Sequence, residues 1–120
     1  MRVRKSPCVK MDQLAAMTQF DVFVNPIAHA RRAYPYVVAL QSDFVPQVHD
    51  PIVAPLALLE LMPTIAGRLA PIVGFNGSRY GVLVPALMGV RARDLVQRRG
   101  SIAAARGELL AAIDYLFFGL

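Results

Sequence analysis

Short apolar runs separated by turn residues dominate the first three quarters of the chain. Three runs are rich in β-branched and aromatic side chains and predict strands: residues 19–24, 36–42 and 52–57. In the first run, apolar and polar positions alternate with the period of two that is typical of a strand. Pro55 lies inside the third run, which predicts a sheet edge or a bulge at that point because proline cannot donate a ladder hydrogen bond.

The dipeptide Asn76-Gly77 separates two further apolar runs, residues 71–75 and 79–84. This arrangement is the strongest short-range sequence signal for a β-hairpin with a two-residue turn. Residues 84–90 are expected to continue as an outer strand or a turn, and residues 94–96 as a short connecting strand.

A helical pattern appears near the C-terminus. One face carries apolar residues at spacings of three or four: Ile102, Ala105, Leu109, Ile113 and Leu116. Ser101 is suited to cap the start of this helix, and Gly119 is suited to end it. Gly107 lies inside the helix and weakens it by about 1 kcal/mol relative to alanine. The pattern as a whole predicts a β-rich α+β domain, a small barrel or two packed sheets followed by one C-terminal helix.

The last eight residues, Ile113–Leu120, are mostly large and apolar. Chain ends are normally polar and frayed. Ile113, Leu116 and one of the two phenylalanines are expected to pack on the domain as part of the helix face. The segment Phe118-Gly119-Leu120 is harder to explain as core, and it predicts docking against a partner, because burying one such side chain yields about 1.5–3 kcal/mol.

The chain has 120 residues, of which 56% are hydrophobic and 18% charged, and this composition suits one small domain. Residues 1–16 carry four basic residues and one acidic residue, and lack periodic apolar positions. We interpret residues 1–16 as a flexible extension that need not be native, with Met17 as an alternative start and residues 17–120 as the domain. Cys8 is the single cysteine, which excludes an internal disulfide and favours a cytoplasmic location.

The net charge of +5 first indicates a nucleic-acid partner, but from Met17 onward nine arginines face seven acidic residues. We interpret the dispersed arginine pairs as solvated loops rather than a phosphate-binding groove. Residues 51–75 are very apolar, yet Glu60 and Arg68 divide them into runs shorter than the ~18 residues of a membrane span. The sequence contains no cluster of cysteine or histidine residues that would predict a metal site, and no cofactor is expected.

No sequence motif of a catalytic or phosphate-binding site is present. His29 and His49 stand beside turn residues and are expected at the surface. One enzymatic alternative stays open: His29, Arg31, Arg32 and Asp43 are the types of residue from which a small barrel ribonuclease could build its site. Their spacing does not require such a site.

From Gln19 to Leu120 the chain resembles the CcdB toxin family of toxin–antitoxin modules. The resemblance rests on five segments in order: Gln19-Phe20-x-Val22, Val38-Ala39-Leu40-Gln41-Ser42-Asp43-Phe44-Val45, Val53-Ala54-Pro55-Leu56-Ala57, Ala70-Pro71-Ile72-Val73, and Ala112-Ile113-Asp114-x-x-Phe117-Phe118-Gly119-Leu120. Each segment alone is a weak signal, and their common order makes the set specific.

The resemblance implies an SH3-like antiparallel barrel with an added small sheet and one C-terminal helix. It implies a homodimer without catalytic activity or cofactor, which poisons DNA gyrase by binding the dimerisation domain of gyrase A. A CcdA-like antitoxin would reverse this binding, in a type II module that maintains a plasmid or genomic element. Direct reading of nucleic acid is expected only of the toxin–antitoxin complex on its operator, and no membrane contact is expected.

Carried over position by position, the resemblance assigns gyrase binding to seven residues: Phe118, Gly119, Leu120, Phe117, Asp114, Phe44 and Val45. Two of them depart from the family pattern, since Phe118 stands where the family typically has Trp and Asp114 where it typically has Asn. The family residue stacks on an arginine of gyrase, and a smaller ring weakens such a contact by roughly 0.5–1 kcal/mol. Two alternatives therefore remain, an endoribonuclease toxin on a related barrel and a non-toxic antitoxin-binding homologue.

Overall fold

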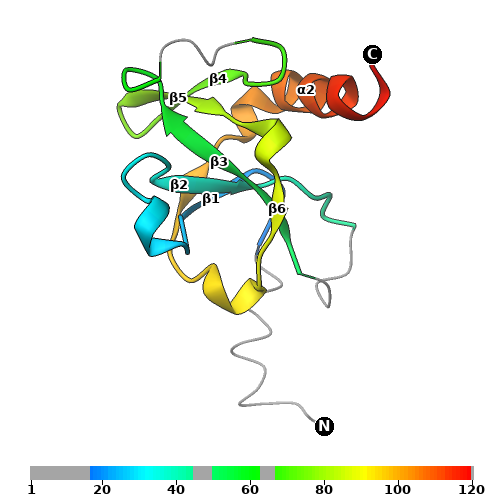
Figure 1. Cartoon of the computed structure of the whole chain (residues 1–120). Helices are drawn as coiled ribbons and strands as arrows, with labels where there is room; N and C mark the ends of the chain where they lie inside the picture. The colour runs from blue at the N-terminus through cyan, green and yellow to red at the C-terminus, as the bar shows by residue number, and fades with distance from the viewer. Residues whose placement is uncertain (1–16, 45–49, 63–66, 120) are drawn as a thin grey trace, which may run out of the picture.

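The computed structural model describes residues 17–44, 50–62 and 67–119 (Figure 1). Seven short strands in these residues form one curled antiparallel sheet, and a single α-helix follows at the C-terminal end. The strands are β1 (Asp21–Val24), β2 (Tyr36–Ala39), β3 (Ile52–Leu58), β4 (Ile72–Phe75), β5 (Ser78–Val82), β6 (Met88–Gly89) and β7 (Arg98–Ser101). The helix is α2 (Arg106–Phe118), and the 3₁₀ turns are η1 (Ala28–Ala30), η2 (Val84–Ala86), η3 (Ala92–Asp94) and η4 (Ala103–Ala105). The fold class expected from the sequence is confirmed.

The strand order in the sheet is β4-β5-β3-β2-β1-β7, and β6 pairs with β3 outside this path. β3 is the longest strand and lies in the centre, paired with β2 along one side and with β5 and β6 along the other. The prediction that Pro55 marks an edge or a bulge is therefore wrong. The Pro55 carbonyl accepts from the Leu83 N–H, so its nitrogen faces the gap between β5 and β6, where no ladder hydrogen bond is lost.

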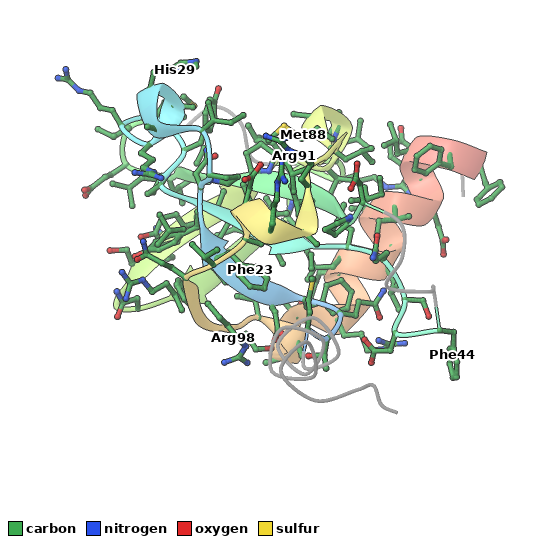
Figure 2. All side chains as sticks on the ribbon, turned by 90° about the horizontal axis from the view of Figure 1, so that it is seen from below. Phe23, His29, Phe44, Met88, Arg91 and Arg98 are labelled. Atoms are coloured by element: carbon green, nitrogen blue, oxygen red, sulfur yellow. The ribbon has the colours of Figure 1, made fainter. Side chains whose placement is uncertain are left out.

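Consecutive side chains of a strand point to opposite faces of the sheet. In the middle of this sheet, the side chains on both faces are buried. On one face, Val22 and Val38 are paired and belong to a core that includes Leu109 and Ala112 of α2. On the other face, Phe23 and its pair Val37 belong to a smaller core. That core also contains Leu95 beyond η3, with Met88 of β6 packed against it (Figure 2). The apolar runs in the sequence are continuous here because neither face meets water.

The predicted hairpin is confirmed. Phe75 pairs with Ser78, and the two residues between them have positive φ angles, 51° at Asn76 and 83° at Gly77. Such a turn has the twist of the flanking strands and favours asparagine followed by glycine. Tyr36, Phe75 and Tyr80 pack edge to face above it, with ring centroids 5.2–6.4 Å apart. Burial of Tyr80, together with the nearby Tyr36, raises the pKa of its phenol.

The segment before the helix differs from the prediction. Residues 94–96 form no strand, and the polar residues Arg98–Ser101 form β7 instead, because β1 offers them a free edge. Ser101 does not cap the α-helix: its hydroxyl accepts from the Ala103 N–H at 3.1 Å, at the start of η4. The helix begins at Arg106, after this 3₁₀ turn.

A buried carboxylate holds β7 on β1. Asp21 is 1% exposed, and its two oxygens accept hydrogen bonds from the Thr18 N–H, the Thr18 hydroxyl and the Arg98 guanidinium, at 2.9, 3.1 and 3.0 Å. The hydrogen bond and charge of Asp21 raise the pKa of Arg98. A buried charge needs such a complete set of partners. Asp21 therefore specifies where the edge strand attaches.

The two ends of the sheet approach each other at Gly100. This glycine has φ +154°, and a Cβ atom placed on it would lie 3.0 Å from Cε1 of Phe75 on β4. The sheet thus curls so far that the Phe75 ring of β4, at one end of the strand order, covers the backbone of β7, at the other end. Glycine is required here by both the backbone conformation and the close approach.

We predict that Gly100→Ala lowers the free energy of unfolding by about 1–3 kcal/mol, because the backbone is strained and Phe75 must move. Gly74→Ala in β4 is the matched control, since an added Cβ there meets no atom within 4 Å and no positive φ is involved. Urea denaturation of both variants at one protein concentration measures the difference. Equal stability of the two variants would contradict this account of the closure.

Candidate functional site

The C-terminal end of α2 carries the exposed aromatic side chains that the sequence assigned to partner binding. Phe117 is 59% and Phe118 is 71% exposed, whereas Leu109 and Ala112 earlier in the helix are buried. Leu116 and Ile113 are half-buried against the core, as expected, but the prediction that one of the two phenylalanines also packs there is wrong, since both are mostly exposed. The helix therefore changes along its length from a core element to an exposed apolar end.

Gly119 ends the helix in the left-handed conformation, with φ 72° and ψ 18°, and its N–H donates to the Tyr115 carbonyl at 3.0 Å. This confirms its predicted role as the helix-terminating residue. The turn fixes the direction in which the chain leaves the helix beside Phe118. Leu120, the last residue of the predicted site, lies outside the described residues.

Phe44 is the most exposed large apolar side chain among the described residues, at 96%. It follows a short polar turn in which its N–H donates to the Ser42 hydroxyl and the Asp43 carboxylate accepts from the Gln19 N–H at 2.7 Å. Phe44 and the C-terminal end of α2 lie on the same side of the molecule (Figures 1 and 2). Val45, predicted to act beside Phe44, lies outside the described residues.

Asp114 is exposed one turn before Phe118 and makes no hydrogen bond or ion pair with the described residues. Its carboxylate is therefore available for a cationic group on a partner. The structure thus presents Phe117, Phe118 and Asp114 on one helix end, with Phe44 on a separate loop of the same side.

Sequence reasoning missed a cation–π pair beside this helix end. The Arg68 guanidinium lies 3.7 Å from the ring centroid of Tyr115. These two residues line an open hollow of about 570 Å³ whose other walls include Leu69, Leu83 and Pro85. Tyr115 precedes Phe118 by three positions, a spacing that places both on one helix face. This spacing was the available signal, but nothing in the sequence pairs Tyr115 with Arg68.

The residues of the ribonuclease alternative are not brought together. Asp43 is bonded to Gln19, just before β1, whereas His29 and Arg31 follow Asn25 at the other end of that strand. His29 and the neighbour of Asp43, Phe44, accordingly lie on opposite sides in Figure 2. Arg31 is used structurally, since its Nε donates to the Asn25 carbonyl at 2.6 Å.

Two other types of site are absent from the described residues. They contain no group of three or more histidine, cysteine, aspartate or glutamate side chains that could hold a metal ion. Among the helices that the structure describes, none is long and apolar enough to cross a membrane.

We predict opposite effects for the same substitution at two points of α2. Gly107→Ala raises the free energy of unfolding by about 0.4–1 kcal/mol, because Gly107 lies in the first turn of α2 without a positive φ, an added Cβ meets no atom within 4 Å, and alanine restricts the unfolded chain. Gly119→Ala lowers it by about 1 kcal/mol, because alanine is strained in the left-handed conformation. Thermal denaturation of both variants tests the pair, and a neutral Gly119→Ala would show that this turn does not hold the helix end.

A comparison with protein families relates the chain to known proteins. The family model described as CcdB protein matches residues 19–119, nearly the whole chain. A search of curated proteins finds no match. The family match confirms the resemblance drawn from the ordered sequence segments, and the curled antiparallel sheet with one C-terminal helix agrees with it. The chain therefore belongs to the CcdB family, whose members are toxins of toxin–antitoxin modules.

Proposed function

We propose that this protein binds the dimerisation domain of gyrase A through the C-terminal end of α2 and thereby poisons DNA gyrase. The observation that carries the proposal is the exposure of Phe117 and Phe118, 59% and 71%, at the end of a helix that is otherwise packed on the core. Family membership supports gyrase as the partner. The proposed activity is binding, without a catalytic step.

The energetics of the exposed helix end favour a partner. Burial of one phenylalanine side chain yields about 1.5–3 kcal/mol, so two of them supply enough to anchor a small interface. Gly119 adds no side chain at the turn, which allows close approach of a partner to the backbone there. Leu120 is proposed as a third apolar contact of the helix end. Phe44 and its chain neighbour Val45 are proposed as a separate apolar contact with the same partner.

We infer that the protein acts as a homodimer. A two-fold symmetric toxin presents two copies of the helix end, and a two-fold symmetric target such as the gyrase A dimer engages both at once. Simultaneous engagement strengthens binding without any new type of contact. A CcdA-like antitoxin that folds onto the toxin would compete with gyrase.

The two departures from the family pattern concern the same contact. Phe118 offers a smaller ring than tryptophan to a gyrase arginine, which weakens stacking. Asp114 adds a carboxylate that can pair with that arginine. Since Asp114 is exposed and has no partner among the described residues, its charge can offset part of the lost stacking.

We predict that the full-length protein binds a gyrase A dimerisation fragment in calorimetry and that deletion of Gly119 and Leu120 abolishes this binding. The deletion removes the terminal contact and the turn beside Phe118, while α2 and the core remain. Circular dichroism of the truncated protein is the control for folding. Binding that survives the deletion, or no binding by either folded protein, would refute the proposal.

We also predict that Phe118→Trp strengthens gyrase binding by roughly 2- to 5-fold, which corresponds to about 0.5–1 kcal/mol of additional stacking. Val96→Trp is the matched control, because Val96 is similarly exposed, at 74%, but belongs to the connection between η3 and β7. An equal gain in affinity from both variants would indicate non-specific hydrophobic association of the added tryptophan rather than a contact at position 118. Growth inhibition in a host whose gyrase is sensitive gives the corresponding functional measurement.

A further inference from the structure

A cluster of arginines lies away from the helix end. Five of the nine arginines from Met17 onward fall between Arg91 and Arg106, together with one acidic residue, Asp94. They belong to one continuous segment of the chain, which runs through η3 and β7 to the start of α2. In Figure 2, Arg91 lies near Met88, and Arg98 lies on the other side of Phe23.

Only part of this positive charge is neutralised within the protein. Arg91 pairs with Asp94 at 3.3 Å, and Arg98 pairs with the buried Asp21 at 3.0 Å. The guanidinium of Arg99 meets only the neutral side chain of Gln97, at 2.9 Å. Arg93 is exposed and makes no hydrogen bond or ion pair with the described residues. Arg106, at the start of α2, likewise donates to a neutral group, the Gln19 side chain, at 2.9 Å. Three cations, Arg93, Arg99 and Arg106, therefore have no acidic partner in the described part of the chain.

The same stretch offers an open backbone edge and an apolar contact. β7 pairs only with β1 in the part of the chain that the structure describes, so its second edge carries no ladder. The register shifts between Val22 and Phe23, opposite Arg99, which marks an irregularity in the pairing. Val96, just before β7, is 74% exposed. We call the exposed groups Arg93, Val96, Arg98 and Arg99 the β7 surface.

We propose that the β7 surface binds an extended acidic segment of a partner protein. An extended chain can hydrogen-bond to a free strand edge, while carboxylates at alternate positions reach the arginines beside it. Val96 offers one apolar contact between them. The positive charge of the β7 surface calls for acidic groups on the partner, since Asp21 and Asp94 are already paired with Arg98 and Arg91.

Nucleic acid fits this surface less well. Residues 91–106 contain no aromatic side chain on which a base could stack. Three cations without an acidic partner are also far fewer than the roughly 6–10 phosphate contacts that give a protein strong electrostatic affinity for DNA. A second explanation is that the arginines and the irregular pairing only protect an open edge from aggregation. In that case an acidic peptide would bind the β7 surface no more tightly than it binds other exposed arginines.

Binding of a fluorescein-labelled deca-glutamate peptide to the full-length protein tests the proposal by fluorescence anisotropy at low salt. The double variant Arg93→Gln/Arg99→Gln removes the two cations of the β7 surface that have no acidic partner and is expected to weaken binding about 5-fold or more. The matched control Arg32→Gln/Arg79→Gln removes two exposed arginines elsewhere, on the loop after η1 and on β5. Its affinity should change less than about 2-fold, because its lost charges act only at long range. Residues 1–16 contribute the same charge in all variants.

Equal weakening by the two double variants, or no measurable binding of the peptide by the unmodified protein, would overturn the proposal. A labelled single-stranded deca-deoxythymidine that binds more tightly than the peptide, and is lost with Arg93→Gln/Arg99→Gln, would also overturn it in favour of nucleic acid. The β7 surface and the C-terminal end of α2 are different elements, so each of these outcomes leaves the gyrase proposal untouched.

Discussion

The burial of β3 on both faces and along both edges is the constraint on which the rest of the structure depends. Val53, Ala54, Leu56 and Ala57 are fully buried, so the strand contributes to both cores at once. The backbone N–H and C=O groups of a buried strand must also be hydrogen-bonded. In β3 they pair with β2, β5 and β6, and the Leu83 N–H donates to the Pro55 carbonyl between β5 and β6. The sheet order places the other strands relative to this one.

The outer strands are fixed by different forces. β4 and β5 are joined by a two-residue turn and packed by an aromatic cluster, which are local interactions. β7 has few apolar side chains and attaches through the buried Asp21 carboxylate and the covered backbone of Gly100. A buried charge fixes position more strictly than apolar contact does, since a shift in register would leave it without partners. The edge that carries the proposed β7 surface is thus held in a defined place.

The candidate gyrase site consists of apolar side chains of α2 that do not pack in the core. The core includes α2 from Leu109 to Leu116, and the two phenylalanines that follow remain mostly exposed. Gly119 then turns the chain without a side chain of its own. An apolar helix end next to a rigid core is a pre-organised binding element, because little conformational entropy is lost when a partner covers it.

The sequence by itself determined the family, the hairpin at Asn76-Gly77, the helix with its end at Gly119, and the exposure of Phe118, because these signals lie in short segments of the chain. Only the tertiary structure decided the place of Pro55, the existence of β7 and the pairing of Arg68 with Tyr115. Each of these depends on a neighbour far along the chain: Leu83 for Pro55, Asp21 for Arg98, and α2 for Arg68. Local propensity carries no information about such partners, so polar residues such as Arg98–Ser101 read as a loop until β1 supplies an edge.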